Sequence, residues 1–87
     1  MIYNSVFDAI SDTPSQSANL KLRAELLQHI QETISQMHGT QAQIAKECGI
    51  TQPRLNDLIN GKISKFSLDA LVNINASLGS EVGLVFA

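Results

Sequence analysis

The stretch from Thr40 to Lys62, TQAQIAKECGITQPRLNDLINGK, limits the possible folds of this chain more than any other part of it. Thr40 and Thr51 each stand before a segment with the apolar spacing of a helix, and a threonine hydroxyl accepts well from the free N–H groups at a helix start. Gly49 follows the first segment and Gly61 the second, and glycine adopts the left-handed conformation that often ends helices. The pattern therefore predicts two short helices joined by a tight turn.

The apolar residues of this stretch indicate how the two helices pack. Ala45 is small enough to let their backbones approach, which a crossing near a right angle requires. Pro53 lies early in the second helix, where its missing N–H costs no hydrogen bond. The residues expected to face inward are Ile44, Ala45, Cys48, Ile50, Leu55, Leu58 and Ile59. The second helix is then expected to project its polar side chains away from the body.

These outward side chains are of types that read bases in DNA. An arginine can pair with guanine in bidentate fashion, glutamine or asparagine can pair with adenine, and the major groove of B-DNA admits one α-helix. The face consists of Gln52, Arg54 and Asn56, with Thr51 and Pro53 at its tip. An alternative for Arg54 is a solvated ion pair with Asp57, three residues later.

Groups suited to phosphate lie on either side of that face. Thr40 and Thr51 place N–H groups at helix starts, and such groups attract phosphate oxygens. Lys62 and Lys65 follow the second helix and are expected to bind the sugar–phosphate backbone. The whole chain has a formal net charge of −2, but residues 41–66 hold four basic and two acidic residues. The net-positive part of the sequence thus coincides with the pattern that predicts DNA binding.

The same stretch resembles the Cro-and-repressor (XRE) family of helix-turn-helix DNA-binding proteins. The motif TQxxIAxxxGITxxxLxxLIxGK is formed by Thr40, Gln41, Ile44, Ala45, Gly49, Ile50, Thr51, Leu55, Leu58, Ile59, Gly61 and Lys62. By this resemblance, Gln41 contacts a phosphate and braces the second helix. The resemblance also implies that Gln52, Pro53 and Arg54 lie at base edges. The segment 60–62, which begins with Asn60, would contact the DNA backbone. Pro53 stands where phage repressors often carry a polar residue, so it offers only apolar contact.

A narrower resemblance covers most of the chain. The runs ANLKLRAELL, TQPRLNDLINGK and FSLDALV are similar to a subgroup of short proteins, many of which are antitoxins of RelE-like ribonuclease toxins and repress their own operons. The expected function is therefore a sequence-specific repressor of double-stranded DNA that acts as a homodimer on a palindromic operator. The alternative is a protein-interaction module that neutralises a RelE-like toxin and binds DNA only in that complex.

The rest of the chain predicts further helices around this motif. Thr13 and Pro14 form a strong helix start, and apolar residues then recur at helical spacing as far as about Met37. Gly39 is expected to end that helix in a left-handed conformation. Ser67 is expected to cap a last helix that Gly79 terminates. The expected fold is a mainly α, compact helical domain: a long first helix, the two-helix motif at 40–61 and one further helix, all within residues 13–79.

The two ends of the chain are expected to flank this helical domain within one single domain of residues 1–87. Residues 1–12 form an N-terminal segment of ambiguous structure. Residues 80–87 alternate apolar and other side chains and predict a short β-strand, which needs a partner for its backbone groups. A second copy of the chain, paired through Val82, Leu84 and Phe86, is the favoured partner. Pairing with the N-terminal segment and packing as an extended tail are the alternatives.

Composition excludes several other classes of protein. One cysteine, Cys48, allows no intramolecular disulfide, and with two histidines it cannot complete a closed zinc site. The sequence contains no apolar run of the roughly 18 residues that a membrane helix needs, so a cytoplasmic protein without a membrane partner is expected. It also shows no acid–base pair, activated nucleophile or phosphate loop. We therefore expect no catalysis, no cofactor and no metal.

Overall fold

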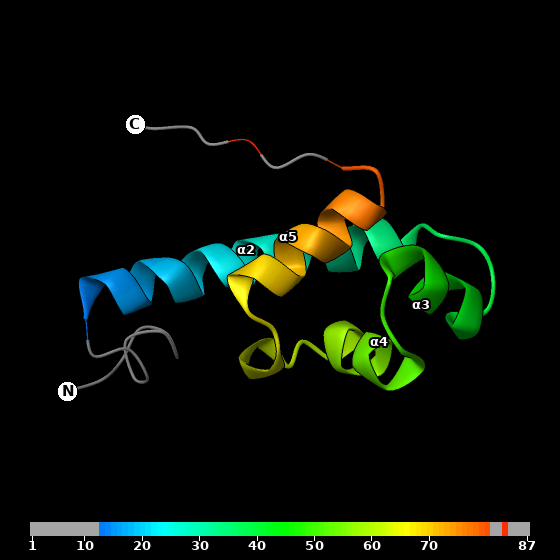
Figure 1. The fold of residues 1–87 in the computed structure, drawn as a ribbon, viewed down its shortest axis with the longest axis horizontal. Coiled ribbons are helices and arrows are strands. Elements are labelled where there is room, and N and C mark those ends of the chain that lie inside the picture. The colour runs from blue at the N-terminus through cyan, green and yellow to red at the C-terminus, as the bar shows by residue number, and fades with distance from the viewer. Residues whose placement is uncertain (1–12, 81–82, 84–87) are drawn as a thin grey trace.

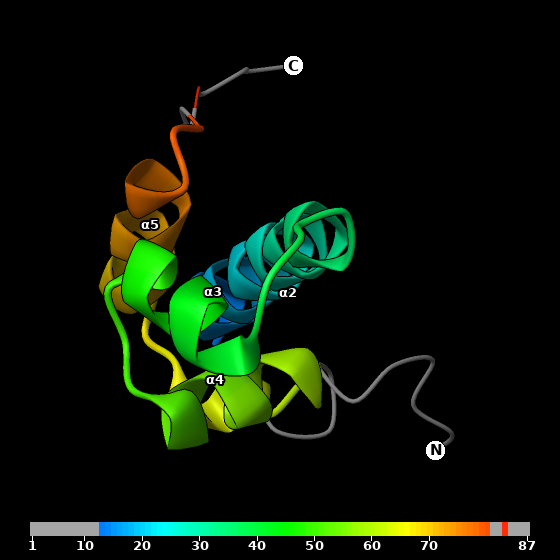
Figure 2. The same ribbon diagram turned by 90° about the vertical axis from the view of Figure 1, so that its right-hand side faces the viewer.

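The computed structural model of the protein describes residues 13–80 and residue 83. Its elements are helices α2 (Pro14–Ser35), α3 (Gln41–Cys48) and α4 (Gln52–Ile59), the 3₁₀ turn η1 (Ile63–Lys65), and helix α5 (Leu68–Ser77). In Figure 1, α2 and α5 lie side by side, and α3 and α4 lie beneath them. Figure 2 shows α3 lying between α5 and α4, so that α4 occupies one side of the molecule.

The expected C-terminal β-strand, residues 80–87, is wrong for the part of it that the structure describes. Every regular element within residues 13–80 is helical, and neither Ser80 nor Gly83 is in a strand. The chain instead leaves α5 through a helical turn, in which the Ser80 N–H donates to the Asn75 carbonyl at 3.1 Å. Alternating side chains alone do not make a strand, because a strand needs a neighbour for its backbone groups. Val82, Leu84 and Phe86 lie outside the described residues, as does the segment 1–12.

Helix α2 begins where the sequence predicts and ends slightly earlier. The Thr13 hydroxyl accepts from the Gln16 N–H at 3.1 Å, which confirms the predicted N-cap. The helix ends at Ser35, and not near Met37, with tighter bonds in its last turn from Gln36 N–H to Thr33 and from Met37 N–H to Ile34. Gly39, with φ of 125°, lies in the connection beyond that end. Glycine is therefore used in the turn toward α3 and does not terminate α2 itself.

Helices α3 and α4 have the predicted boundaries and caps. Thr40 and Thr51 accept from the N–H groups of Gln43 and Arg54, respectively. Gly49 ends α3 in the left-handed region, with φ of 74°. The Gln43 side chain also accepts from the Thr40 N–H at 2.8 Å and so completes a capping box that the sequence analysis did not identify. The turn between the two helices is thus determined by local hydrogen bonds on both sides.

One aromatic residue in the connection after α4 is a core residue that the sequence analysis missed. Phe66 was not among the residues expected to face inward, yet its side chain is 1% exposed. It directly precedes the N-cap Ser67 of α5, and it belongs to the same buried cluster as Leu71, four residues after that cap. This spacing is that of a hydrophobic staple, which fixes the angle at which a chain enters a helix.

A single buried cluster holds the helices together. It consists of Leu26, Leu27, Ile30, Ile34, Ile44, Ala45, Cys48, Leu55, Leu58, Phe66, Leu71 and Ile74. Ile59, which was expected to face inward, is exposed, and so are Leu22 and Val72. Single exposed apolar residues of this kind are common on protein surfaces.

Candidate nucleic-acid interface

Helix α4 combines a fully buried anchor with an exposed polar face. Leu55 and Leu58 are 0% exposed and fix the helix in the core. Thr51, Gln52, Pro53 and Asn56 are all exposed, as the sequence predicts for residues that contact DNA. The side chains on the outer face are short and carry no net charge, so this face offers hydrogen bonds and an apolar contact more than electrostatic attraction.

A side chain of α2 supports the far end of α4. The Gln31 Nε2 group donates to the carbonyl of Leu58 at 3.0 Å and to that of Ile59 at 3.2 Å. These carbonyls belong to the last turn of α4, where helix carbonyls lack partners within the helix. Sequence reasoning missed this role, although Gln31 stands at an apolar-stripe position, four residues after Leu27 and three before Ile34. The bond fixes how far α4 projects from α2.

The two helix starts differ in what they offer a phosphate. At the start of α3, Thr40 and Gln41 are exposed, and the capping box uses the N–H groups of Thr40 and Gln43. The amides of Gln41 and the residue after it, which have no partner within the helix, remain. At the start of α4, Pro53 has no N–H, and the Arg54 N–H donates to Thr51. The start of α3 is therefore the better phosphate site of the two.

The residues after α4 form a small charged group. Lys62 and Lys65 each contact Asp57, with Nζ to carboxylate oxygen distances of 3.5 and 3.6 Å. The lysine side chains are about half exposed, whereas that of Asp57 is 18% exposed. The Asp57 carboxylate is thus shared by these lysines, and Arg54 forms no ion pair with it among the described residues. Asn60, the C-cap of α4, is exposed beside them.

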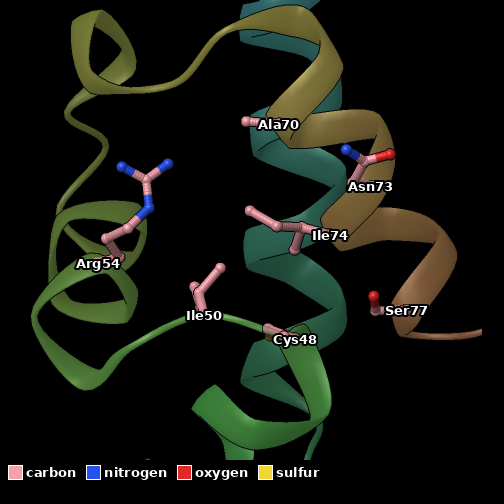
Figure 3. A pocket seen from close by; sticks show the side chains of 8 residues that line it. Cys48, Ile50, Arg54, Ala70, Asn73, Ile74 and Ser77 are labelled. Atoms are coloured by element: carbon pink, nitrogen blue, oxygen red, sulfur yellow. The ribbon is translucent and has the colours of Figure 1, made fainter.

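Arg54 differs from the other residues predicted to contact DNA because it is partly buried. Its guanidinium carbon lies over the ring of Phe66, 4.6 Å from the ring centre. Figure 3 shows the side chain running from α4 along a cleft of about 220 Å³ that is lined on the other side by Asn73, Ile74 and Ser77 of α5. Arg54 is therefore held sideways over Phe66 and is partly buried, whereas Gln52 is exposed.

The chain has one cysteine, and the structure places it in the core. Cys48 is buried, and burial, with a smaller contribution from the Glu47 charge, raises the pKa of its thiol. A thiol of this kind is protonated at neutral pH and is a poor nucleophile. Nowhere in the described part of the chain do three His, Cys, Asp or Glu side chains gather as metal ligands would.

No helix of the described residues is long and apolar enough to span a membrane.

Comparison with known proteins agrees with the arrangement of α3 and α4. No curated protein matches the chain. Residues 9–86, however, match the family described as a helix-turn-helix domain. Because this match covers most of the chain, the protein belongs to the helix-turn-helix domain family.

Proposed function

We propose that this protein is a sequence-specific, double-stranded DNA-binding regulator of transcription that acts as a repressor in the cytoplasm. The observation that carries the proposal is the exposed outer face of α4, anchored in the core by Leu55 and Leu58. In the XRE-like mode of binding, Gln52 and Asn56 pair with base edges, and the ring of Pro53 contacts a thymine methyl group. The proposal involves no catalytic step, cofactor or metal.

The same proposal assigns the DNA backbone to the residues around that face. The free amides of Gln41 and the residue after it contact a phosphate at the start of α3, and the Thr40 hydroxyl donates to the same phosphate. On the other side, Asn60, Lys62 and Lys65 contact the backbone beyond the end of α4. The lysine side chains are about half exposed and lie 3.5 and 3.6 Å from the Asp57 carboxylate, so each can turn its ammonium group toward a phosphate.

A homodimer on a palindromic operator is part of this proposal. One short helix reads only a few base pairs, and the chain has a formal net charge of −2. A monomer therefore has little nonspecific attraction to add to its few base contacts. Joining copies doubles the contacts, and two-fold symmetry in the protein then requires dyad symmetry in the DNA.

Selection from a random duplex library near physiological salt tests this function. The proposal predicts enrichment of a palindrome, and it predicts that Gln52→Ala and Asn56→Ala each relax the preference at one base position in each half-site, at a cost of about 1–3 kcal/mol. Gln28→Ala removes an exposed glutamine from α2 and serves as the matched control. Absence of any enriched sequence with the folded wild-type protein would contradict the proposal.

A second candidate function is the neutralisation of a RelE-like toxin, with DNA binding only in the complex. The N-terminal part of α2 extends beyond the other helices, and Leu22 on it is 38% exposed (Figure 1). Such a surface leaves room for a protein partner without blocking α4. Co-expression with a small basic protein encoded by the neighbouring gene tests this candidate. A stable complex that protects ribosomal RNA or messenger RNA from that protein supports it, and independent behaviour of the two proteins contradicts it.

A further inference from the structure

Phe66 connects three helices at one edge of the proposed interface. Its ring is buried in the core, and its backbone carbonyl accepts from Nη1 of Arg23 in α2 at 3.2 Å. The Arg23 Nε group also donates to Asn19 at 2.8 Å, so this arginine is held along α2. On its other side, the Phe66 ring lies under the guanidinium of Arg54 from α4. Two arginines from different helices thus contact the same residue.

Positive charge is concentrated around this contact. Arg23 and Arg54 contact Phe66, and Lys62 and Lys65 follow α4 just before it. We name these residues the basic edge; they are four of the six basic residues of the chain. Among the described residues, Asp57 is the only carboxylate in an ion pair with this edge, and it contacts the lysines alone. The arginines therefore keep their full charge for an anion.

The direction of Arg54 separates it from the residues proposed to read bases. Base edges lie on the floor of the major groove, within reach of side chains that project furthest from α4. Gln52 and Asn56 are exposed and meet this condition, whereas Arg54 is partly buried and runs along the cleft to the ring of Phe66 (Figure 3). A side chain that leaves the helix sideways faces the wall of the groove, where the phosphates lie.

From this geometry we infer that Arg54 binds a DNA phosphate and not a base, and that Phe66 is its positioning residue. The inference rests on the proposed DNA-binding function and assigns a role within it. A ring attracts a guanidinium to its face and leaves the N–H groups in the guanidinium plane able to donate. No hydrogen bond among the described residues uses those side-chain donors of Arg54. The adjacent cleft of about 220 Å³ gives a phosphate oxygen, or the water it replaces, access to them.

Salt dependence and base discrimination, measured together, distinguish a phosphate contact from a base contact. The substrates are the duplex enriched by the wild-type protein, its single-base-pair variants and an unrelated duplex. Arg54→Ala is expected to weaken binding to all of them alike, by about tenfold. It is also expected to lower the slope of log affinity against log salt by about 0.9, because one phosphate contact is lost. Lys46→Ala, which removes an exposed positive charge from α3, is the control and leaves the slope unchanged.

Two further variants test the role of Phe66 and the phosphate assignment of Arg54. Phe66→Leu keeps an apolar side chain in the core. It is expected to weaken binding to all duplexes alike by about two- to fivefold, which corresponds to the free energy of a partly solvated cation–π contact. In the Arg54→Ala background the same substitution has no further effect on DNA affinity. Arg54→Lys keeps the charge and most of the salt slope, because a phosphate accepts from an ammonium group, whereas a bidentate base contact is lost with it.

Circular dichroism first establishes that each variant is folded. If Phe66→Leu does not fold, the ring-current shift of the Arg54 side-chain protons in the NMR spectrum of the wild-type protein replaces it, and an unshifted signal overturns the role of Phe66. Loss of discrimination at one base position in Arg54→Ala, with an unchanged salt slope, overturns the phosphate assignment and leaves DNA binding intact. Failure of the wild-type protein to bind any duplex overturns the proposed function and this inference with it.

Discussion

Asn75 shows at the scale of one residue where the described core is not optimised for stability. Its side chain is 1% exposed, and neither its Nδ2 nor its Oδ1 atom has a hydrogen-bond partner among the described residues. Asn75 lies one helical turn after Leu71 and directly follows Ile74 in the sequence of α5. A buried amide without partners costs about 1–3 kcal/mol relative to a satisfied one.

Replacing this amide by an apolar side chain of similar size is expected to stabilise the protein. Asn75→Leu should raise the free energy of unfolding by about 1 kcal/mol, as measured by urea denaturation. Asn73→Leu, an exposed position on the same helix, is the control and should change it by less than about 0.5 kcal/mol. Destabilisation by Asn75→Leu would contradict the view that the unpaired amide costs stability.

The buried thiol of Cys48 is expected to make the folded protein less stable at alkaline pH. Burial raises the pKa of the thiol above its ordinary value, so the folded protein holds its proton at a pH where the unfolded chain releases it. The stabilising effect is complete below the pKa of the unfolded chain and is lost as the pH rises above it. Urea midpoints of the wild type should therefore fall more steeply above about pH 9 than those of Cys48→Ala. Parallel curves for the two proteins would contradict this account.

At the scale of elements, the placement of α4 depends on one glutamine of α2. Gln31 donates to the last carbonyls of α4, and Gly61, just beyond that end, has a φ of 73°. A Cβ atom at residue 61 would lie 3.5 Å from Gln31 Nε2, which is ordinary contact. Gln31 thus caps the carbonyl groups at the end of α4, just before the left-handed turn at Gly61. It also links the candidate interface to α2.

Removing that link should cost stability and affinity together. Gln31→Ala is expected to lower the free energy of unfolding by about 1 kcal/mol, the net value of a hydrogen bond. It should also weaken binding to the enriched duplex without changing which sequence is preferred, because no base contact is removed. Urea denaturation and a repeat of the duplex selection measure these effects, with Gln28→Ala as the control. A changed sequence preference would show that Gln31 does more than support α4.

The elements that were predicted correctly from the sequence are those whose ends are defined by local chemistry. Thr40, Gly49 and Thr51 each act on neighbouring backbone groups, so their roles follow from the sequence around them. The role of Phe66 depends on Arg23 and Arg54, which come from other helices, and no local pattern reveals such contacts. The β-strand was wrong for a related reason, because strand pairing is a long-range property that alternation of side chains does not establish.

At the scale of the whole molecule, the proposed dimer makes a prediction about DNA length. Recognition helices related by two-fold symmetry read half-sites about 34 Å apart, or one turn of the duplex. Inserting about five base pairs between the half-sites turns one half-site to the opposite face of the DNA. Gel-shift affinity for the enriched palindrome should then fall to that of a single half-site. Unchanged affinity would indicate monomers that bind independently.

The central claim is that the outer face of α4 contacts DNA, and an NMR titration tests it most directly. The ¹⁵N-labelled protein is titrated with the duplex that it enriches, and signals of the side-chain amides and backbone are followed. The account predicts the largest changes at the side-chain amides of Gln52 and Asn56 and at the backbone amides of the start of α3. Changes confined to the exposed face of α2, with the signals of α4 unmoved, would contradict it.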